Sequence, residues 1–99
     1  MKQLINRYKD LLKKGYFFEA HEALEEYWFP RRKDKSPKVL IVKGFINAAV
    51  SLELHKRGRL QASKRVWKTY EKLTKLLNEN SDSSLKELKS YVDSFKIDN

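Results

Sequence analysis

The chain has no cysteine, no long apolar run and no convincing segment of alternating apolar and polar residues. The missing cysteine excludes disulfides, thiolate zinc sites and cysteine nucleophiles. The apolar runs are too short for a membrane span of about 20 residues, and the start "MKQLINRYKD" lacks the apolar segment of a signal peptide. Without alternation there is no strand to predict. We therefore expect a cytoplasmic protein that does not enter a membrane.

Length and composition are those of one small globular domain. A chain of 99 residues is short enough for a single domain and long enough to bury a modest core. A hydrophobic fraction of 40% and an aromatic fraction of 12% argue against wholesale disorder. We therefore predict that residues 1–99 form a single domain.

Positive charge dominates, because 22 lysines and arginines outnumber 13 acidic residues and give a formal net charge of +9. One basic block is the segment 31–38, which includes Arg31 and Arg32. In a second block, spacings of four, four and three place on one helix face Lys64, Lys68, Lys72 and Lys75. Such a stripe can follow phosphates, so non-specific nucleic-acid binding is one hypothesis and a solvated lysine-rich face is the other. No helix-turn-helix, RNP-like or zinc-finger pattern favours specific binding.

Apolar residues recur at helical spacing along the chain, which predicts an all-α fold, a compact bundle of about five helices. The expected helices cover residues 2–14, 16–29, 37–57, 60–78 and a last short stretch. Ser84 and Glu87 have the spacing of a capping box for that last helix. The third helix is apolar over most of its circumference, so we place it at the centre of the bundle.

Two glycines stand in equivalent places. Gly15 and Gly58 each precede a predicted helix, and a small residue follows each glycine by five positions, Ala20 or Ser63. Small residues allow two helices to approach closely, as in tetratricopeptide hairpins. We interpret this as shared packing at two helix junctions and not as a sequence repeat.

The segment "GYFFEAHEALEEYWF" concentrates a histidine and carboxylates among aromatic residues. On a helix, His21 and Glu25 share one face, and Trp28 lies one turn further along it. These three border the apolar seam, whereas Glu22 and Glu26 fall on an outward face. His21, Glu25 and Trp28 are therefore the candidate site.

Polar residues also recur every four positions along the third helix, at Lys43, Asn47, Ser51 and His55. In an antiparallel hairpin, Glu25 would lie level with Lys43, and His21 with Asn47. His55 would lie about 12–15 Å further along, which argues against a metal site built from both histidines. Two interpretations stay open: a hydrogen-bonded network that ties the helices together, or a ligand pocket. The pocket would be lined by His21, Glu25, Trp28, Lys43 and Asn47.

The string "HEALE" differs from the zincin motif H-E-x-x-H, because Glu25 replaces the second histidine and no third ligand follows. A di-iron bundle needs Glu-x-x-His on two helices, and the chain has neither that order nor a second copy. No serine lies in an elbow-like context. We therefore predict no metal and no cofactor. A metal-assisted hydrolase that uses His21 and Glu25 is an alternative.

Two longer stretches resemble a known family. "YFFEAHEALEEYW" contains A-H-E-x-x-E-x-x-W, and "KGFINAAVSLELHKRG" is similar to Q-G-x-I-Q-x-A-A-A closing on a glycine. Over residues 8–75 or so, the chain resembles the small bacterial and archaeal proteins catalogued as domain of unknown function 309. The resemblance implies a compact all-helical fold without an established activity, and it supports the same three candidate residues. Lys43 and Asn47 stand where glutamines are usual in that family.

The leading hypothesis from the sequence is a non-enzymatic module that binds a small molecule or a protein partner at His21, Glu25 and Trp28. The alternatives are the metal-assisted hydrolase and nucleic-acid binding through the fourth helix and the segment 31–38. Whether the protein is an enzyme stays open. Self-association into a homo-oligomer through aromatic-rich helix faces also stays open.

Overall fold

The computed structural model describes residues 1–95, and this part of the chain is helical without a strand. It contains α1 (Lys2–Lys13), α2 (Phe17–Trp28), the short 3₁₀ helix η1 (Phe29–Arg31), α3 (Pro37–Lys56), α4 (Leu60–Thr74) and α5 (Ser83–Asp93). The predicted all-α bundle of five α-helices is confirmed.

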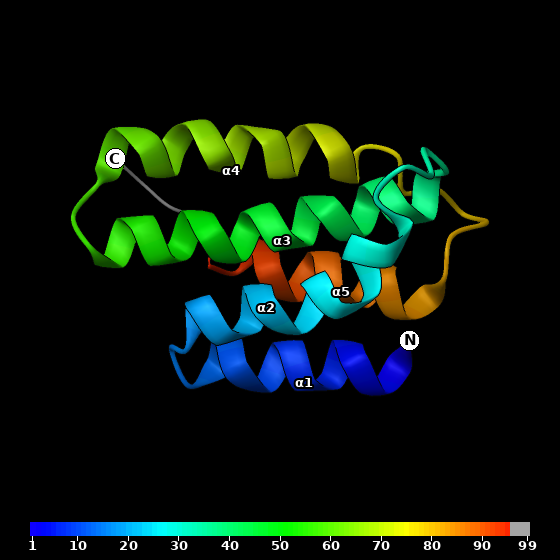
Figure 1. The fold of residues 1–99 in the computed structure, drawn as a ribbon, viewed down its shortest axis with the longest axis horizontal. Coiled ribbons are helices and arrows are strands. Elements are labelled where there is room, and N and C mark those ends of the chain that lie inside the picture. Colours follow the sequence, from blue (N-terminus) through cyan, green and yellow to red (C-terminus); the bar gives the residue numbers. More distant parts are fainter. Residues whose placement is uncertain (96–99) are drawn as a thin grey trace.

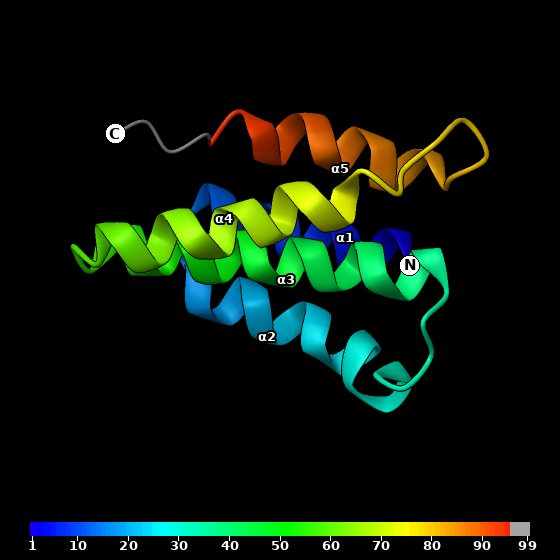
Figure 2. The ribbon, with the colours of Figure 1, turned by 90° about the horizontal axis from the view of Figure 1, so that it is seen from above.

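Helix α3 forms the centre of the bundle. Figure 1 shows α4 on one side of α3 and both α2 and α1 on the other, and Figure 2 shows α2 and α5 on opposite sides. Half of the 20 residues of α3 are buried, and they are spread around the helix because neighbours cover it on several sides. The predicted central position of the third helix is therefore confirmed.

The two glycine turns have the same geometry. Gly15 and Gly58 both adopt φ of 80°, where a side chain would be strained. In each turn the glycine N–H donates to the carbonyl three residues back, and the next N–H donates to the carbonyl five back. The small residues that follow, Ala20 and Ser63, are both fully buried. The predicted packing at two helix junctions is present.

A reciprocal pair of serines joins α3 to α4. The Ser51 hydroxyl donates to the Ser63 carbonyl at 2.7 Å, and the Ser63 hydroxyl donates to the Ser51 carbonyl at 2.8 Å. Both side chains are fully buried, so these bonds satisfy groups that would otherwise be costly to remove from water. The contact fixes one register between the two helices.

Two helix boundaries differ from the prediction by more than one residue. Helix α4 ends at Thr74, because its hydroxyl bonds back to the Tyr70 carbonyl and the next amides form tighter turns. Helix α5 begins two residues earlier than predicted, and its cap is Asp82, whose carboxylate accepts from the Ser84 N–H at 2.9 Å. A carboxylate also suits the positive end of the helix dipole, so Asp82 replaces the predicted capping box.

Tyr8 carries a buried hydroxyl that donates to the Phe45 carbonyl at 2.6 Å. Burial raises the pKa of Tyr8 far above its ordinary value, because the phenolate would lose its hydration. An unfolded chain ionises this tyrosine near pH 10, whereas the folded chain keeps it neutral. The contribution of Tyr8 to stability is therefore intact below about pH 10 and falls above it by about 1.4 kcal/mol per pH unit.

We expect Tyr8→Phe to cost about 1 kcal/mol at neutral pH through the lost hydrogen bond. Above about pH 10, the unfolding free energy of this variant should fall less steeply than that of the natural chain. Urea unfolding across this pH range measures both effects. Tyr16→Phe is the control, since Tyr16 is exposed. Equal steepness for Tyr8→Phe and the natural chain would contradict the assignment.

Candidate binding groove beside His21

His21 is bonded within its own helix. Its Nε2 lies 3.0 Å from a Glu25 carboxylate oxygen, and its Nδ1 donates to the Phe18 carbonyl at 3.0 Å. The His21 side chain is mostly buried, at 19% exposure, while Glu25 is partly exposed. Both ring nitrogens therefore already have partners along α2.

The cross-helix pairings expected from the sequence do not form among residues 1–95. Asn47 donates to the Lys43 carbonyl on its own helix at 2.9 Å, so it does not reach His21. The Lys43 ammonium lies 5.7 Å from the centre of the Trp28 ring, and Glu25 pairs with His21 instead. Of the predicted partners, Lys43 and Trp28 are thus the two that meet across the helices.

The register between α2 and α3 explains why the predicted cross-helix pairs do not form. His21 lies beside Val50 and Leu54, about one helical turn further along α3 than the level of Asn47. Figure 2 shows the segment 29–36 bulging away from α3 before the chain returns. The segment of η1 and the following loop holds the end of α2 away from the start of α3. A prediction that assumes a tight antiparallel hairpin therefore pairs His21 with a residue too near the start of α3.

This register creates a groove between the start of α2 and the end of α3. The groove has a volume of about 310 Å³ and is open to solvent. We call it the His21 groove, and its lining residues are Phe18, His21, Val50, Glu53, Leu54 and Arg57. Glu25, Trp28, Lys43 and Asn47 lie outside this lining. The candidate site from the sequence is therefore split, with His21 alone in the groove.

The part of the His21 groove that is left without a partner is apolar surface. Its charged residues are paired, since Arg57 Nε lies 2.6 Å from a Glu53 carboxylate oxygen. Phe18, in contrast, is 49% exposed, and its ring lies 5.3 Å from the His21 ring. Val50 and Leu54 complete the apolar wall. Val50 and Leu54 lie about one turn beyond Asn47, the residue predicted to face His21. The sequence would have identified them if the register between α2 and α3 had been known.

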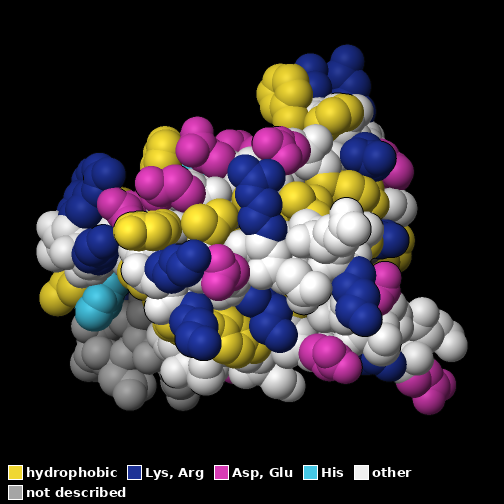
Figure 3. All heavy atoms as spheres, turned by 90° about the horizontal axis from the view of Figure 1, so that it is seen from below, with side chains coloured by type: hydrophobic (Ala, Val, Ile, Leu, Met, Phe, Trp, Pro, Cys, Tyr) yellow, Lys and Arg dark blue, Asp and Glu magenta, His cyan; other side chains and the backbone are white. Residues whose placement is uncertain are grey.

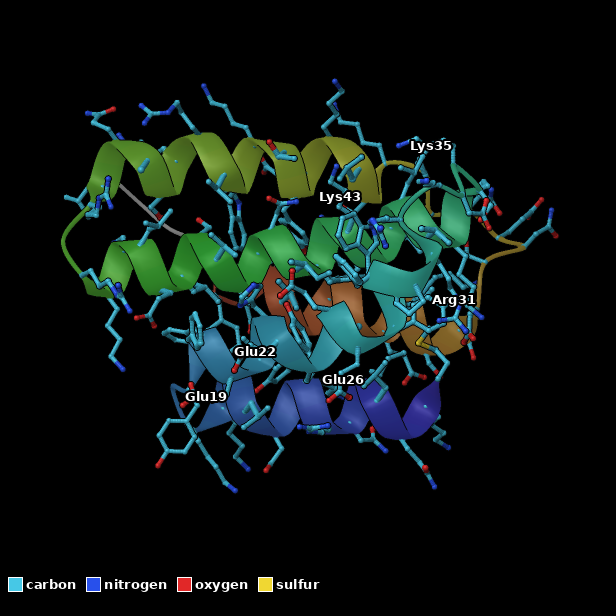
Figure 4. The ribbon with its side chains drawn as sticks, viewed as in Figure 1. Glu19, Glu22, Glu26, Arg31, Lys35 and Lys43 are labelled. Carbon is cyan, nitrogen blue, oxygen red and sulfur yellow. The ribbon has the colours of Figure 1, made fainter. Side chains whose placement is uncertain are left out.

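The outer face of α2 is acidic. This helix contains no lysine or arginine, and its exposed acidic row consists of Glu19, Glu22 and Glu26. Figure 4 shows the three side chains along the front of the helix, and Figure 3 shows acidic side chains gathered over α2. Within residues 1–95, the cation within 4 Å of this row is Arg7, at 3.4 Å from Glu26. The row is a local negative strip on a chain of net charge +9.

The predicted nucleic-acid residues lie in two separate places. Arg31 and Arg32 fold back onto Tyr27 and Phe29, with each guanidinium 4.0 Å from a ring centre and hydrogen-bonded to a carbonyl. Figure 4 places Arg31 on the far side of α3 from α4. Of the predicted lysines, Lys64, Lys68 and Lys72 are on α4 and Lys75 is its C-cap, and the structure does not bring the two groups together.

A second hollow, of about 350 Å³, lies between the starts of α3 and α5. Three of its polar side chains are engaged in the α4–α5 connection: Asn78 accepts from the Asn80 N–H at 2.8 Å, Ser81 accepts from the Asn78 N–H at 2.9 Å, and Asp82 caps α5. These bonds stabilise the α4–α5 connection, so we do not assign a ligand to this hollow.

The described residues contain neither a cluster of metal ligands nor a membrane-spanning helix. In residues 1–95, no three histidine, cysteine, aspartate or glutamate side chains gather so that they could hold a metal ion. None of the helices in this part of the chain is both long and apolar enough to cross a membrane.

One of three comparisons with known proteins gives a match, and it covers residues 5–66. No curated protein and no solved structure gives a significant match. The family model matches most of α1, the whole of α2 and α3, and both walls of the His21 groove. The match confirms the resemblance seen in the sequence, and the chain therefore belongs to the family described as Domain of unknown function (DUF309).

Proposed function

We propose that the protein is a non-enzymatic interaction module whose His21 groove holds a large apolar side chain from a basic segment of a partner protein. The observation that carries the proposal is the half-exposed Phe18 ring beside a groove whose charged groups already have partners. Full burial of an exposed apolar side chain contributes about 1.5–3 kcal/mol, so covering the exposed half of Phe18 contributes about half of that, and the partner's side chain adds its own burial.

The size of the groove favours a side chain over a cofactor. Its volume of about 310 Å³ is at the low end of the range for small-molecule sites. The groove is also open, so a ligand seated there would stay partly in water. A partner protein can cover this opening with its own surface, whereas a small molecule cannot.

The acidic row favours a basic partner. Charges more than about 10 Å apart are largely screened at physiological salt, so a docking segment responds mainly to the local strip and less to the net charge. Lysines or arginines placed over Glu19 and Glu22 would steer the partner and fix its orientation. An amphipathic helix with apolar and basic faces has this chemistry.

The hydrolase alternative receives less support. His21 and Glu25 are bonded to each other and to α2, and a catalytic metal needs three protein ligands with an open position. The apolar wall formed by Phe18, Val50 and Leu54 offers no ligand atoms. A binding role accounts for these residues directly.

We expect Phe18→Ala to weaken binding of a fluorescein-labelled amphipathic helical peptide, with leucine and phenylalanine on one face and lysine on the other, by about tenfold. Fluorescence anisotropy measures the affinity. Phe29→Ala is the matched control, because Phe29 is similarly exposed but lies outside the groove. Equal losses in the two variants would argue against the groove.

We also expect reversal of the acidic row to weaken binding of the same peptide. The double variant Glu19→Lys with Glu22→Lys should lower the affinity several-fold, and more so at low salt. The control Glu79→Lys with Glu87→Lys makes the same change in net charge at exposed positions away from α2. If both double variants bind equally, net charge and not the acidic row determines the affinity.

A further inference from the structure

The exposed face of α4 carries five cations that the interaction module does not use. We call this surface the α4 basic face, and it consists of the half-buried Lys64, the exposed Arg65, Lys68 and Lys72, and the C-cap residue Lys75, with one acidic residue, Glu71, among them. The opposite face of the helix is buried through Ser63, Trp67, Tyr70 and Thr74. Figure 1 shows α4 at the edge of the bundle, and Arg65, Lys68 and Lys72 are exposed to solvent.

These cations lack acidic partners. Within residues 1–95, no carboxylate lies within 4 Å of the nitrogens of the five side chains, whereas Lys14, Arg57 and Lys89 each form an ion pair on their own helix. None of the five therefore forms an ion pair in the described part of the chain, and with Glu71 on the same helix the face keeps a net charge of +4. A partner can gain from neutralising it.

The row is also held in a fixed geometry. Lysines four residues apart on a helix are about 6 Å apart along its axis, so Lys64 to Lys75 spans roughly 16 Å. The serine pair fixes α4 against α3, and Gly44 permits close approach near the other end, where Leu73 and Thr74 lie against its backbone. The helix that carries the charges therefore needs no rearrangement when a partner binds.

We propose that the α4 basic face binds the phosphate backbone of double-stranded nucleic acid without sequence preference. A row of unpaired cations on a firmly packed helix fits a regular row of phosphates, and binding releases condensed counterions from the duplex. Single strands are bound through stacking on exposed aromatic rings. The aromatic residues of α4, Trp67 and Tyr70, are buried against the core, so the face offers no stacking platform.

Two other anionic partners fit less well. A second copy of the chain could present its acidic row, but each copy carries +9 and an exposed ion pair contributes at most about 1 kcal/mol. A helix that lies on a membrane inserts an apolar face. The apolar face of α4 is already packed against the bundle.

The test is a salt titration of the full chain with DNA and RNA duplexes of about 20 base pairs. A plot of log affinity against log salt should have a slope of about −3 to −4.5, since each neutralised phosphate contributes about −0.9. Equal slopes for the two duplexes are expected, because both present phosphates. The triple variant Arg65→Gln, Lys68→Gln, Lys72→Gln should reduce the slope by about 2–3.

The matched control is Arg31→Gln, Arg32→Gln, Lys33→Gln, which removes the same charge from the segment after α2 and should leave the slope nearly unchanged. Circular dichroism and thermal unfolding of both variants show that the fold is retained. The proposal is overturned if duplexes do not bind at low salt, or if the two variants lose affinity equally. Tighter binding to single strands or to phosphatidylserine vesicles than to duplexes overturns it as well.

Discussion

Replacing Phe45 with alanine is expected to lower the unfolding free energy by about 3–5 kcal/mol. Phe45 is fully buried on α3, and its ring lies 6.4 Å from the Tyr8 ring of α1 and 5.7 Å from the Tyr70 ring of α4. Truncation would therefore leave a cavity where three helices meet. Because small domains are stable by only about 5–15 kcal/mol, urea unfolding should show a large drop in midpoint.

Phe45→Leu separates cavity formation from a general effect of mutation. Leucine keeps most of the volume, so we expect a cost of about 1.5 kcal/mol or less. A loss below about 1 kcal/mol for Phe45→Ala would mean that α3 is not the packing centre of the fold. If Phe45→Leu binds the groove peptide as tightly as the natural chain, a change in the core can lower stability without changing binding at the groove.

The second large effect is expected at Gly44. An added Cβ there would lie 3.1 Å from Leu73 Cβ and 3.3 Å from Thr74 Cγ2, so α3 and α4 approach too closely for a branched side chain. We expect Gly44→Val to cost about 2–3 kcal/mol through overpacking, and valine adds a small loss of helix propensity. Thermal unfolding followed by circular dichroism measures the change.

Gly44→Ala is the graded control. Alanine gains about 1 kcal/mol of helix propensity, which offsets part of the cost of the tight contact. It should therefore fall between the natural chain and the valine variant. If Gly44→Val is as stable as Gly44→Ala, the helices are not in close contact at this position.

Most of the fold could be predicted because local rules and packing agree. The apolar third helix could be buried only by neighbours on several sides, which made its central position predictable. Gly15 and Gly58 could be interpreted because a positive φ at a helix end requires glycine. The cap of α5 was harder, because both Asp82 and Ser84 are good caps and only the geometry of the connection decides between them.

The candidate site could be predicted only in part. Spacing along one helix correctly placed His21 beside Glu25, since residues four apart share a face. The partners across α3 depend on the path of the segment 29–36, which no periodicity describes. The one-turn shift brings Val50 and Leu54 to His21, so the groove could not be found before the path of that segment was known.

The most direct test of the His21 groove is to locate the bound peptide. Isotope-labelled protein would be titrated with the lysine-rich amphipathic peptide and followed by two-dimensional NMR of backbone amides and aromatic rings. We expect saturable shifts centred on Phe18, His21, Val50 and Leu54, with smaller shifts along the acidic row and none on the exposed face of α4. Shifts centred on α4 or on the hollow between α3 and α5, or no shifts at saturating peptide, would contradict the proposed groove.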